Sequence, residues 1–152
     1  ARHNPADWNG MTIVGKVAVP LSADSGLQAI RQRILDENLP IARKSGICRS
    51  QSFRDDYIGL LLSFLDETEL RPLKIVANAG NGCAWPVMER LLPHLPCSVI
   101  PLNPEPDGTY PNGVPNPLLP EKREQTSQAV LAHNADFGIA WDGDFDRCFF
   151  FD

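Results

Sequence analysis

The fold is decided by one stretch near the end of the sequence, FGIAWDGDFDRCFFF, residues 137–151. Its first five residues form an apolar run of strand length, and its last four are again apolar and aromatic. Between these runs lies DGDFDR, in which three aspartates stand at alternate positions: Asp142, Asp144 and Asp146. The stretch therefore predicts two strands joined by an acidic loop.

The residues before this stretch alternate between strand and helix patterns. Strands are predicted at residues 73–77 and 97–102, and helices at residues 85–92 and 120–134. Pro86 suits the first turn of its helix. The tight turn at residues 80–82 contains two glycines. This alternation predicts a layered α/β domain.

The first half of the chain has a weaker pattern. Residues 11–20 are expected to form a strand, and a helix capped by Ser22 or Asp24 follows and fades by residues 38–40. Residues 40–52 have no period and are expected to form a linker, and residues 53–65 form a second helix. The proline-rich residues 103–120 predict an ordered but irregular loop.

Charge and composition narrow the class of protein. The 152 residues have a formal net charge of −5, which gives no reason to expect nucleic acid or an anionic membrane as a partner. No apolar stretch approaches the roughly 20 residues that span a bilayer, so we expect a soluble, cytoplasmic protein. The four cysteines are widely spaced and are expected to be free, buried thiols.

The acidic loop is the strongest candidate for a functional site. A strand delivers the three aspartates to its carboxyl end, where α/β sheets bind ligands. In a straight strand alternate Cα atoms would stand about 6.6 Å apart, so Gly143 is expected to help the loop curl. Packed carboxylates repel one another unless a cation compensates, and Mg²⁺ favours such oxygen ligands. Arg147 would be a phosphate clamp or a counter-charge.

Three other interpretations of the loop can be compared with the magnesium site. An EF-hand needs a glycine where Arg147 stands and helices on both sides, so we reject it. A solvated acidic turn would not require three aspartates and an arginine. An aspartyl-nucleophile phosphatase, with Asp142 attacking phosphorus and Asp144 as the acid, stays open as an alternative.

Several motifs together resemble one enzyme family, the α-D-phosphohexomutases, and within it the bacterial phosphomannomutases. The acidic loop matches that family's metal loop, D-G-D-x-D-R. The opening residues 3–10, HNPADWNG, resemble its active-site loop, T-A-S-H-N-P-x-x-Y-N-G-x-K. Further similarity lies in residues 73–82, LKIVANAGNG, and 106–117, PDGTYPNGVPNP. The resemblance extends over the whole chain.

The resemblance implies a four-domain enzyme with a mixed sheet and flanking helices in its second domain. Residues 1–50 would be the end of domain 1, with the active-site loop and a linker, and residues 51–152 would be domain 2. Domains 3 and 4 would be missing. Family members transfer phosphate between a serine and a hexose phosphate with the help of Mg²⁺. By this resemblance the three aspartates are metal ligands, Arg147 lies by the phosphate, and His3 belongs to the active-site loop.

Two departures from the family pattern affect the chemistry. Arg2 stands where the family has its phosphoserine, and Thr12 stands where it has a lysine. An arginine cannot form the phosphoenzyme, so we expect this chain to lack mutase activity. A non-catalytic domain that keeps the fold and the metal is therefore an alternative. Mannose and glucose phosphates cannot be distinguished from this sequence.

Overall fold

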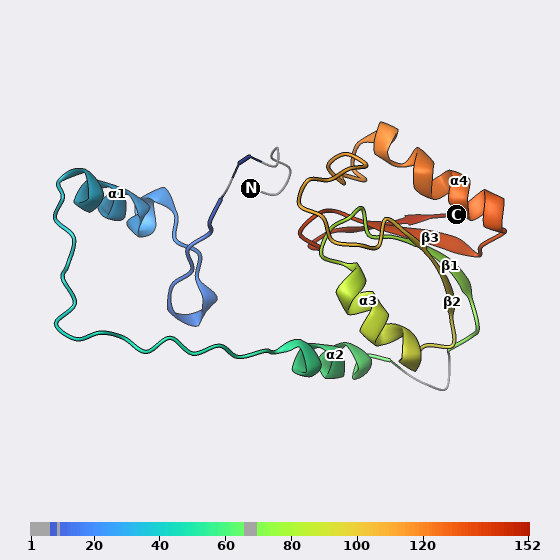
Figure 1. The fold of residues 1–152 in the computed structure, drawn as a ribbon, viewed down its shortest axis with the longest axis horizontal. Coiled ribbons are helices and arrows are strands. Elements are labelled where there is room, and N and C mark those ends of the chain that lie inside the picture. Colours follow the sequence, from blue (N-terminus) through green and yellow to red (C-terminus); the bar gives the residue numbers. More distant parts are fainter. Residues whose placement is uncertain (1–6, 9, 66–69) are drawn as a thin grey trace. The chain divides into compact units, whose positions relative to one another are not determined.

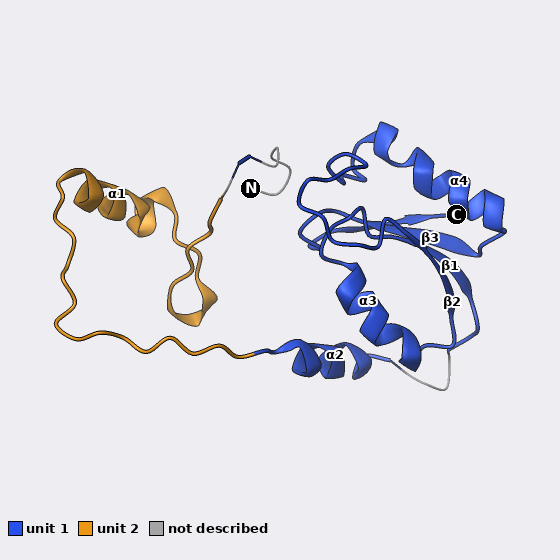
Figure 2. Ribbon diagram, viewed as in Figure 1, with its two compact units in different colours: residues 1–9, 52–152 blue, residues 10–51 orange. Residues whose placement is uncertain are grey.

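The computed structural model describes residues 7–8, 10–65 and 70–152, which contain two compact units (Figure 2). The smaller unit, residues 10–51, contains the short helical turns η1 (Lys16–Ala18) and η2 (Ala23–Leu27) and the helix α1 (Gln28–Leu35). Ser22 caps η2 through a reciprocal pair of hydrogen bonds with Ser25, which confirms the predicted helix start. Residues 40–52 contain no helix or strand, as the linker prediction required.

The predicted strand at residues 11–20 is wrong. The structure has one isolated antiparallel bridge there, between Val14 and Pro20, and the turn η1 lies between them. A strand is stable only when a neighbour takes up its backbone hydrogen bonds. Within the described residues this segment pairs only with itself, so its apolar, β-branched composition does not produce a strand.

The larger unit, whose described residues are 7–8, 52–65 and 70–152, is built around one four-stranded sheet. Its elements are α2 (Arg54–Leu62), β1 (Lys74–Asn78), α3 (Trp85–Leu91), η3 (Leu92–His94), β2 (Ser98–Leu102), η4 (Pro120–Lys122), α4 (Glu124–His133), β3 (Phe137–Trp141) and β4 (Cys148–Phe151). The strand order is β2-β1-β3-β4; β1 runs parallel to β2 and β3, and β4 is antiparallel to β3. The predicted α/β class with a mixed sheet and flanking helices is confirmed.

The two faces of the sheet are covered by different helices (Figure 1). On one face, α3 packs on a core formed by Ala77, Ala79, Ala84, Met88 and Trp141. On the other face lies α4, which contacts β1 and β3. Because β1 is central and covered on both faces, its residues 75–77 are buried and apolar. Pro101 is tolerated in β2 because that strand lies at the edge of the sheet.

Gly138 in β3 allows the close approach of α4. A Cβ atom at this position would lie 2.7 Å from Cγ2 of Val130 and 3.0 Å from Cγ2 of Thr126. Thr126 is fully buried and accepts a hydrogen bond from the Asn78 side chain at 3.0 Å. The helix is therefore fixed to the sheet both by packing and by a polar contact at the end of β1.

The four cysteines are free, as predicted, but the expectation that they are buried is wrong. Cys48, Cys83 and Cys148 are exposed, and Cys97 is half-buried. Cys48 lies in the linker and Cys83 in a loop, where no second layer covers them. Among the described residues, no helix combines the length and the apolar character that crossing a membrane requires.

Candidate metal centre

The acidic loop lies at the point of the sheet where α/β folds bind ligands. From β1 the chain passes through α3 to β2 on one side, and then through α4 to β3 on the other side of β1. The connections diverge at the carboxyl ends of β1 and β3, which leaves a crevice there. The loop of residues 142–147 follows β3 directly, so the fold places it beside this crevice.

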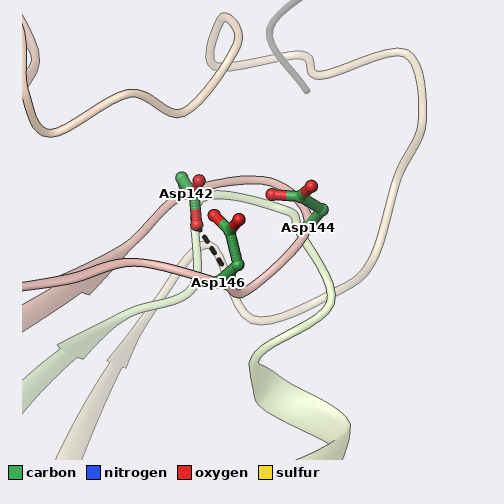
Figure 3. A group of neighbouring side chains, drawn as sticks. All are labelled: Asp142, Asp144 and Asp146. Carbon is green, nitrogen blue, oxygen red and sulfur yellow. Dashed lines mark hydrogen bonds between the residues drawn. The ribbon is translucent and has the colours of Figure 1, made fainter. Parts of the chain in front are cut away.

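The three predicted aspartates converge. Asp142, Asp144 and Asp146 each offer one carboxylate oxygen, and these oxygens lie within 4.8 Å of one another (Figure 3). The backbone turns back on itself because the Phe145 amide donates to the Asp142 carbonyl oxygen at 3.2 Å. The loop thus brings together carboxylates that a straight strand would hold apart.

Phe145, and not the expected Gly143, adopts the left-handed conformation that curls this loop. Its φ is 64°, a value that non-glycine residues adopt only at a cost. The Phe145 ring packs edge-on against Trp141 with a centroid separation of 5.8 Å and joins the core beneath α3. Burying this ring offsets the strain of the turn. Phe145 therefore anchors the loop while Asp144 and Asp146 remain exposed on either side of it.

Asp142 organises the loop through hydrogen bonds to both of its carboxylate oxygens. Its side chain is fully buried. Oδ1 accepts from the backbone amides of Asp146 and Arg147, each at 3.1 Å. Oδ2 accepts from Nε of Arg147 at 2.9 Å and forms an ion pair with Nη2 of the same residue, also at 2.9 Å. Burial raises the pKa of Asp142, but the hydrogen bonds from Arg147 and Asp146 lower it by more, so the carboxyl pKa lies below its usual range.

Arg147 is the counter-charge of the loop in this structure. Besides its two contacts with Asp142, its Nε lies 3.5 Å from Oδ1 of Asp146. The hydrogen bond to Asp142 raises the pKa of the guanidinium further. The Arg147 side chain is 31% exposed, so part of it still faces solvent. Of the two predicted roles, the counter-charge is visible here and the phosphate clamp stays a prediction.

Glycines allow two neighbouring loops to touch the acidic loop. A Cβ at Gly143 would lie 2.6 Å from the Tyr110 hydroxyl oxygen, and a Cβ at Gly82 would lie 2.7 Å from the Gly143 carbonyl oxygen. That carbonyl oxygen also accepts from the Cys83 amide at 3.0 Å. The glycine turn after β1 therefore supports the acidic loop, in line with the structural role that its sequence favoured. The proline-rich loop also lies beside the acidic loop.

Tyr110 is a neighbour of the site that the sequence reasoning missed. Burial, together with the nearby Cys83, Asp144 and Asp142, raises the pKa of its hydroxyl. The residue has a φ of 48°, which turns the proline-rich loop back toward the aspartates. The only available signal was an aromatic residue among turn formers at residues 106–113.

Three further site residues were predicted near the start of the sequence: Arg2, His3 and Thr12. Thr12 is exposed and belongs to the unit of residues 10–51. Arg2 and His3 lie outside the described residues. The structure therefore brings together Asp142, Asp144, Asp146 and Arg147.

The aspartate cluster fits a divalent cation. Two oxygens bound to one Mg²⁺ at about 2.1 Å lie at most about 4.2 Å apart, so carboxylates within 4.8 Å need only small side-chain movements. Asp144 and Asp146 are exposed and can make them. Asp142 would exchange one of its present hydrogen bonds for the ion. Strands β3 and β4 flank the loop, which agrees with the rejection of an EF-hand.

Comparisons with known proteins agree with this geometry. Residues 55–152 match the family model described as phosphoglucomutase/phosphomannomutase, alpha/beta/alpha domain II. Among curated relatives, "Phosphohexose mutases" of Xanthomonas campestris pv. campestris is 51% identical over 152 residues, and "Phosphomannomutase" of Salmonella typhimurium is 47% identical over 159 residues. These matches cover 100% of this chain but only 34% and 35% of those proteins.

A solved structure gives the same result for the fold. The crystal structure of a phosphoglucomutase/phosphomannomutase family protein from Burkholderia thailandensis superposes with a TM-score of 0.85 at 34% identity. The superposition covers 98% of this chain and 31% of that one. The sequence match to the domain model and the structural match thus agree on one assignment. The chain belongs to the phosphoglucomutase/phosphomannomutase family.

Proposed function

We propose that this chain is the metal-binding part of a phosphohexomutase, an isomerase that interconverts hexose 6-phosphate and hexose 1-phosphate. The observation that carries the proposal is the convergence of Asp142, Asp144 and Asp146 in one loop at the carboxyl end of β3. The three carboxylates would hold Mg²⁺, which when bound neutralises charge on phosphoryl oxygens. The names of the curated relatives, phosphomannomutase and phosphohexose mutases, support this class of reaction.

Arg147 has two tasks in this proposal. It holds Asp142 in place through Nε and Nη2, and the exposed part of its side chain can approach a phosphate beside the metal. If the ion displaces part of the Asp142–Arg147 pair, the freed donors turn toward the phosphate. The same residue would then stabilise the loop without metal and contact the phosphate with metal.

The domain organisation follows from the same proposal. We assign residues 1–50 to the end of a first domain, with the active-site loop and linker, and residues 51–152 to the second domain. The chain spans about a third of the length of the curated relatives that it matches. The third and fourth domains, which would bind the sugar and its phosphate, lie outside this sequence.

Arg2 and Thr12 bear on whether this chain can catalyse the mutase reaction. They occupy the positions of the family's phosphoserine and lysine, and neither can replace the chemistry of the residue it stands for. We therefore propose that the chain as it stands is not a mutase. The second candidate function, a non-catalytic metal-binding or assembly domain, rests on these two substitutions.

The phosphatase alternative is disfavoured by the position of Asp142. A nucleophilic carboxylate needs a free oxygen aimed at the phosphorus atom. The Asp142 side chain is fully buried, and its two oxygens are engaged by three hydrogen bonds from Asp146 and Arg147 and by an ion pair with Nη2 of Arg147. The residue is built to organise the loop.

Calorimetric titration with Mg²⁺ tests the metal site. The chain is expected to bind one Mg²⁺, and Asp144→Asn is expected to weaken binding by about tenfold or more. Asp56→Asn, a change at an exposed carboxylate in the first turn of α2, serves as the matched control. Equal affinities in all three proteins would remove the metal centre from the proposal. If Arg2 pairs with the aspartates and competes with the ion, Arg2→Ser will tighten binding.

An assay of phosphoryl exchange tests the proposal that Arg2 and Thr12 leave the chain without mutase activity. The purified chain is expected to give no exchange between mannose 6-phosphate and mannose 1-phosphate, because no side chain at position 2 can accept the phosphoryl group. The reaction would be followed by phosphorus NMR with the bisphosphate present. Turnover above that of a heat-denatured sample would contradict the proposal.

A further inference from the structure

A small pocket lined by both polar and apolar residues lies beside the acidic loop at the carboxyl ends of β1 and β3. It has a volume of about 40 Å³. Its lining includes Asn78, Asn116, Lys122 and Trp141, from β1, the proline-rich loop, η4 and β3 respectively. The pocket lies in the crevice where the connections of the sheet diverge.

The asparagines around this pocket already have partners. Asn78 donates to Thr126 and accepts from the Gly80 amide and from Nδ2 of Asn103. Oδ1 of Asn103 in turn accepts from Nδ2 of Asn112. This network joins the ends of β1 and β2 to the proline-rich loop.

One acceptor in the pocket is left over. Oδ1 of Asn116 is buried and has no hydrogen-bond partner among the described residues. A buried amide oxygen without a donor is unfavourable, and such groups in native proteins usually bind an ordered water. Oδ1 of Asn116 can therefore accept a hydrogen bond from a molecule bound in this pocket.

A hydrogen-bond donor also lines this pocket. Lys122 is half-buried, and its ammonium forms no hydrogen bond or ion pair with another described residue. It lies against the backbone of Gly113, since a Cβ there would be 2.5 Å from Nζ. Gly113 has a φ of +80°, a conformation that suits glycine. A glycine at this turn thus gives the lysine access to the pocket.

We propose that the pocket binds one ordered water that accepts a hydrogen bond from Nζ of Lys122 and donates one to Oδ1 of Asn116. The volume of about 40 Å³ exceeds the roughly 10–15 Å³ that one water requires and is too small for a sugar. The water satisfies both groups at once, because it accepts from the ammonium and donates to the amide. It ties the proline-rich loop to η4.

Through this water-mediated contact, Lys122 becomes a positioning residue for the acidic loop. The loop that it holds carries Tyr110 and Pro115, which lie 2.6 Å and 3.6 Å from the place where a Cβ at Gly143 would stand. Pro115 also lies against Gly80 in the turn after β1. If the proline-rich loop moves away, both supports of the acidic loop move with it.

Lys122→Met tests this inference, because methionine keeps an unbranched side chain but removes the charge and the donor. Lys44→Met, at an exposed lysine of the linker, is the control. A high-resolution crystal structure of the unaltered protein is expected to show water within hydrogen-bond distance of both Lys122 and Asn116. In Lys122→Met, amide hydrogen exchange in residues 103–119 is expected to rise about three- to tenfold, the effect of losing one hydrogen bond.

Two results would overturn the proposal: a pocket without this water, including one in which Lys122 bonds directly to Asn116, or exchange rates in Lys122→Met that equal those of Lys44→Met. Neither readout requires bound metal, so a failed metal centre would not be mistaken for a failed water site. Where Mg²⁺ does bind, we expect Lys122→Met to weaken it by about tenfold, as losses of outer-shell support do.

Discussion

Replacing Asp142 with alanine is expected to lower the free energy of unfolding by about 2–3 kcal/mol, because it leaves two backbone amides and a guanidinium without their acceptor. The amides of Asp146 and Arg147 donate to Oδ1, and the Arg147 side chain donates to Oδ2. The same change removes a proposed metal ligand, and Mg²⁺ affinity is expected to fall by at least about 100-fold. Urea denaturation and calorimetry measure the two effects separately.

Asp144→Ala is the matched control for that change. Asp144 belongs to the same cluster but is exposed, so its replacement is expected to weaken metal binding while changing the free energy of unfolding by less than about 1 kcal/mol. If both alanine variants lost stability equally, the structural role assigned to Asp142 would be wrong.

The contribution of Asp142 to the free energy of unfolding depends on pH. The folded pKa of Asp142 lies below the unfolded value of about 3.9, so its contribution to stability is complete above that value and is lost as the pH falls through the folded pKa. In metal-free buffer, Asp142→Asn is therefore expected to lose less stability than the unaltered chain as the pH falls below about 4.

The sequence predicted the larger unit well because its elements have strong local signals. The central strand β1 has an apolar middle, α3 has a proline in its first turn, and the carboxylates of the acidic loop alternate after an apolar strand. Each of these patterns needs few residues to be recognised. The placement of the loop at the carboxyl edge follows because it comes directly after a strand of an α/β sheet. The strand order β2-β1-β3-β4 was not predicted, because a strand–helix alternation does not determine which strands become neighbours.

The sequence failed where structure depends on distant partners. Residues 11–20 have the composition of a strand, but pairing, not composition, decides whether a strand forms. The full occupation of Asp142 by hydrogen bonds depends on the turn at Phe145, whose left-handed conformation its residue type does not indicate. Tyr110 contacts Gly143, which lies 33 residues later in the sequence, and a local sequence pattern cannot predict such a contact.

The close contact between Gly82 and Gly143 makes the stability of the fold sensitive to any side chain at Gly82. A Cβ at Gly82 would lie 2.7 Å from the carbonyl oxygen and 2.9 Å from the Cα of Gly143, and 3.1 Å from the Ala79 carbonyl oxygen. All three atoms belong to the backbone, so no side chain can rotate away. Gly82→Ala is therefore expected to push the acidic loop off the turn after β1 and to lower the free energy of unfolding by about 1–3 kcal/mol.

Gly108→Ala separates this clash from the general effect of replacing a glycine. A Cβ at Gly108 would meet nothing within 4 Å, and the residue lies in a loop of the same unit. Its replacement is expected to leave stability unchanged or slightly raised, since alanine restricts the unfolded chain. Because the Cys83 amide donates to the Gly143 carbonyl oxygen, displacing the loop also breaks this bond. Gly82→Ala should therefore weaken Mg²⁺ binding although it changes no ligand, and equal stability of the two alanine variants in urea would show that the loops are not in contact.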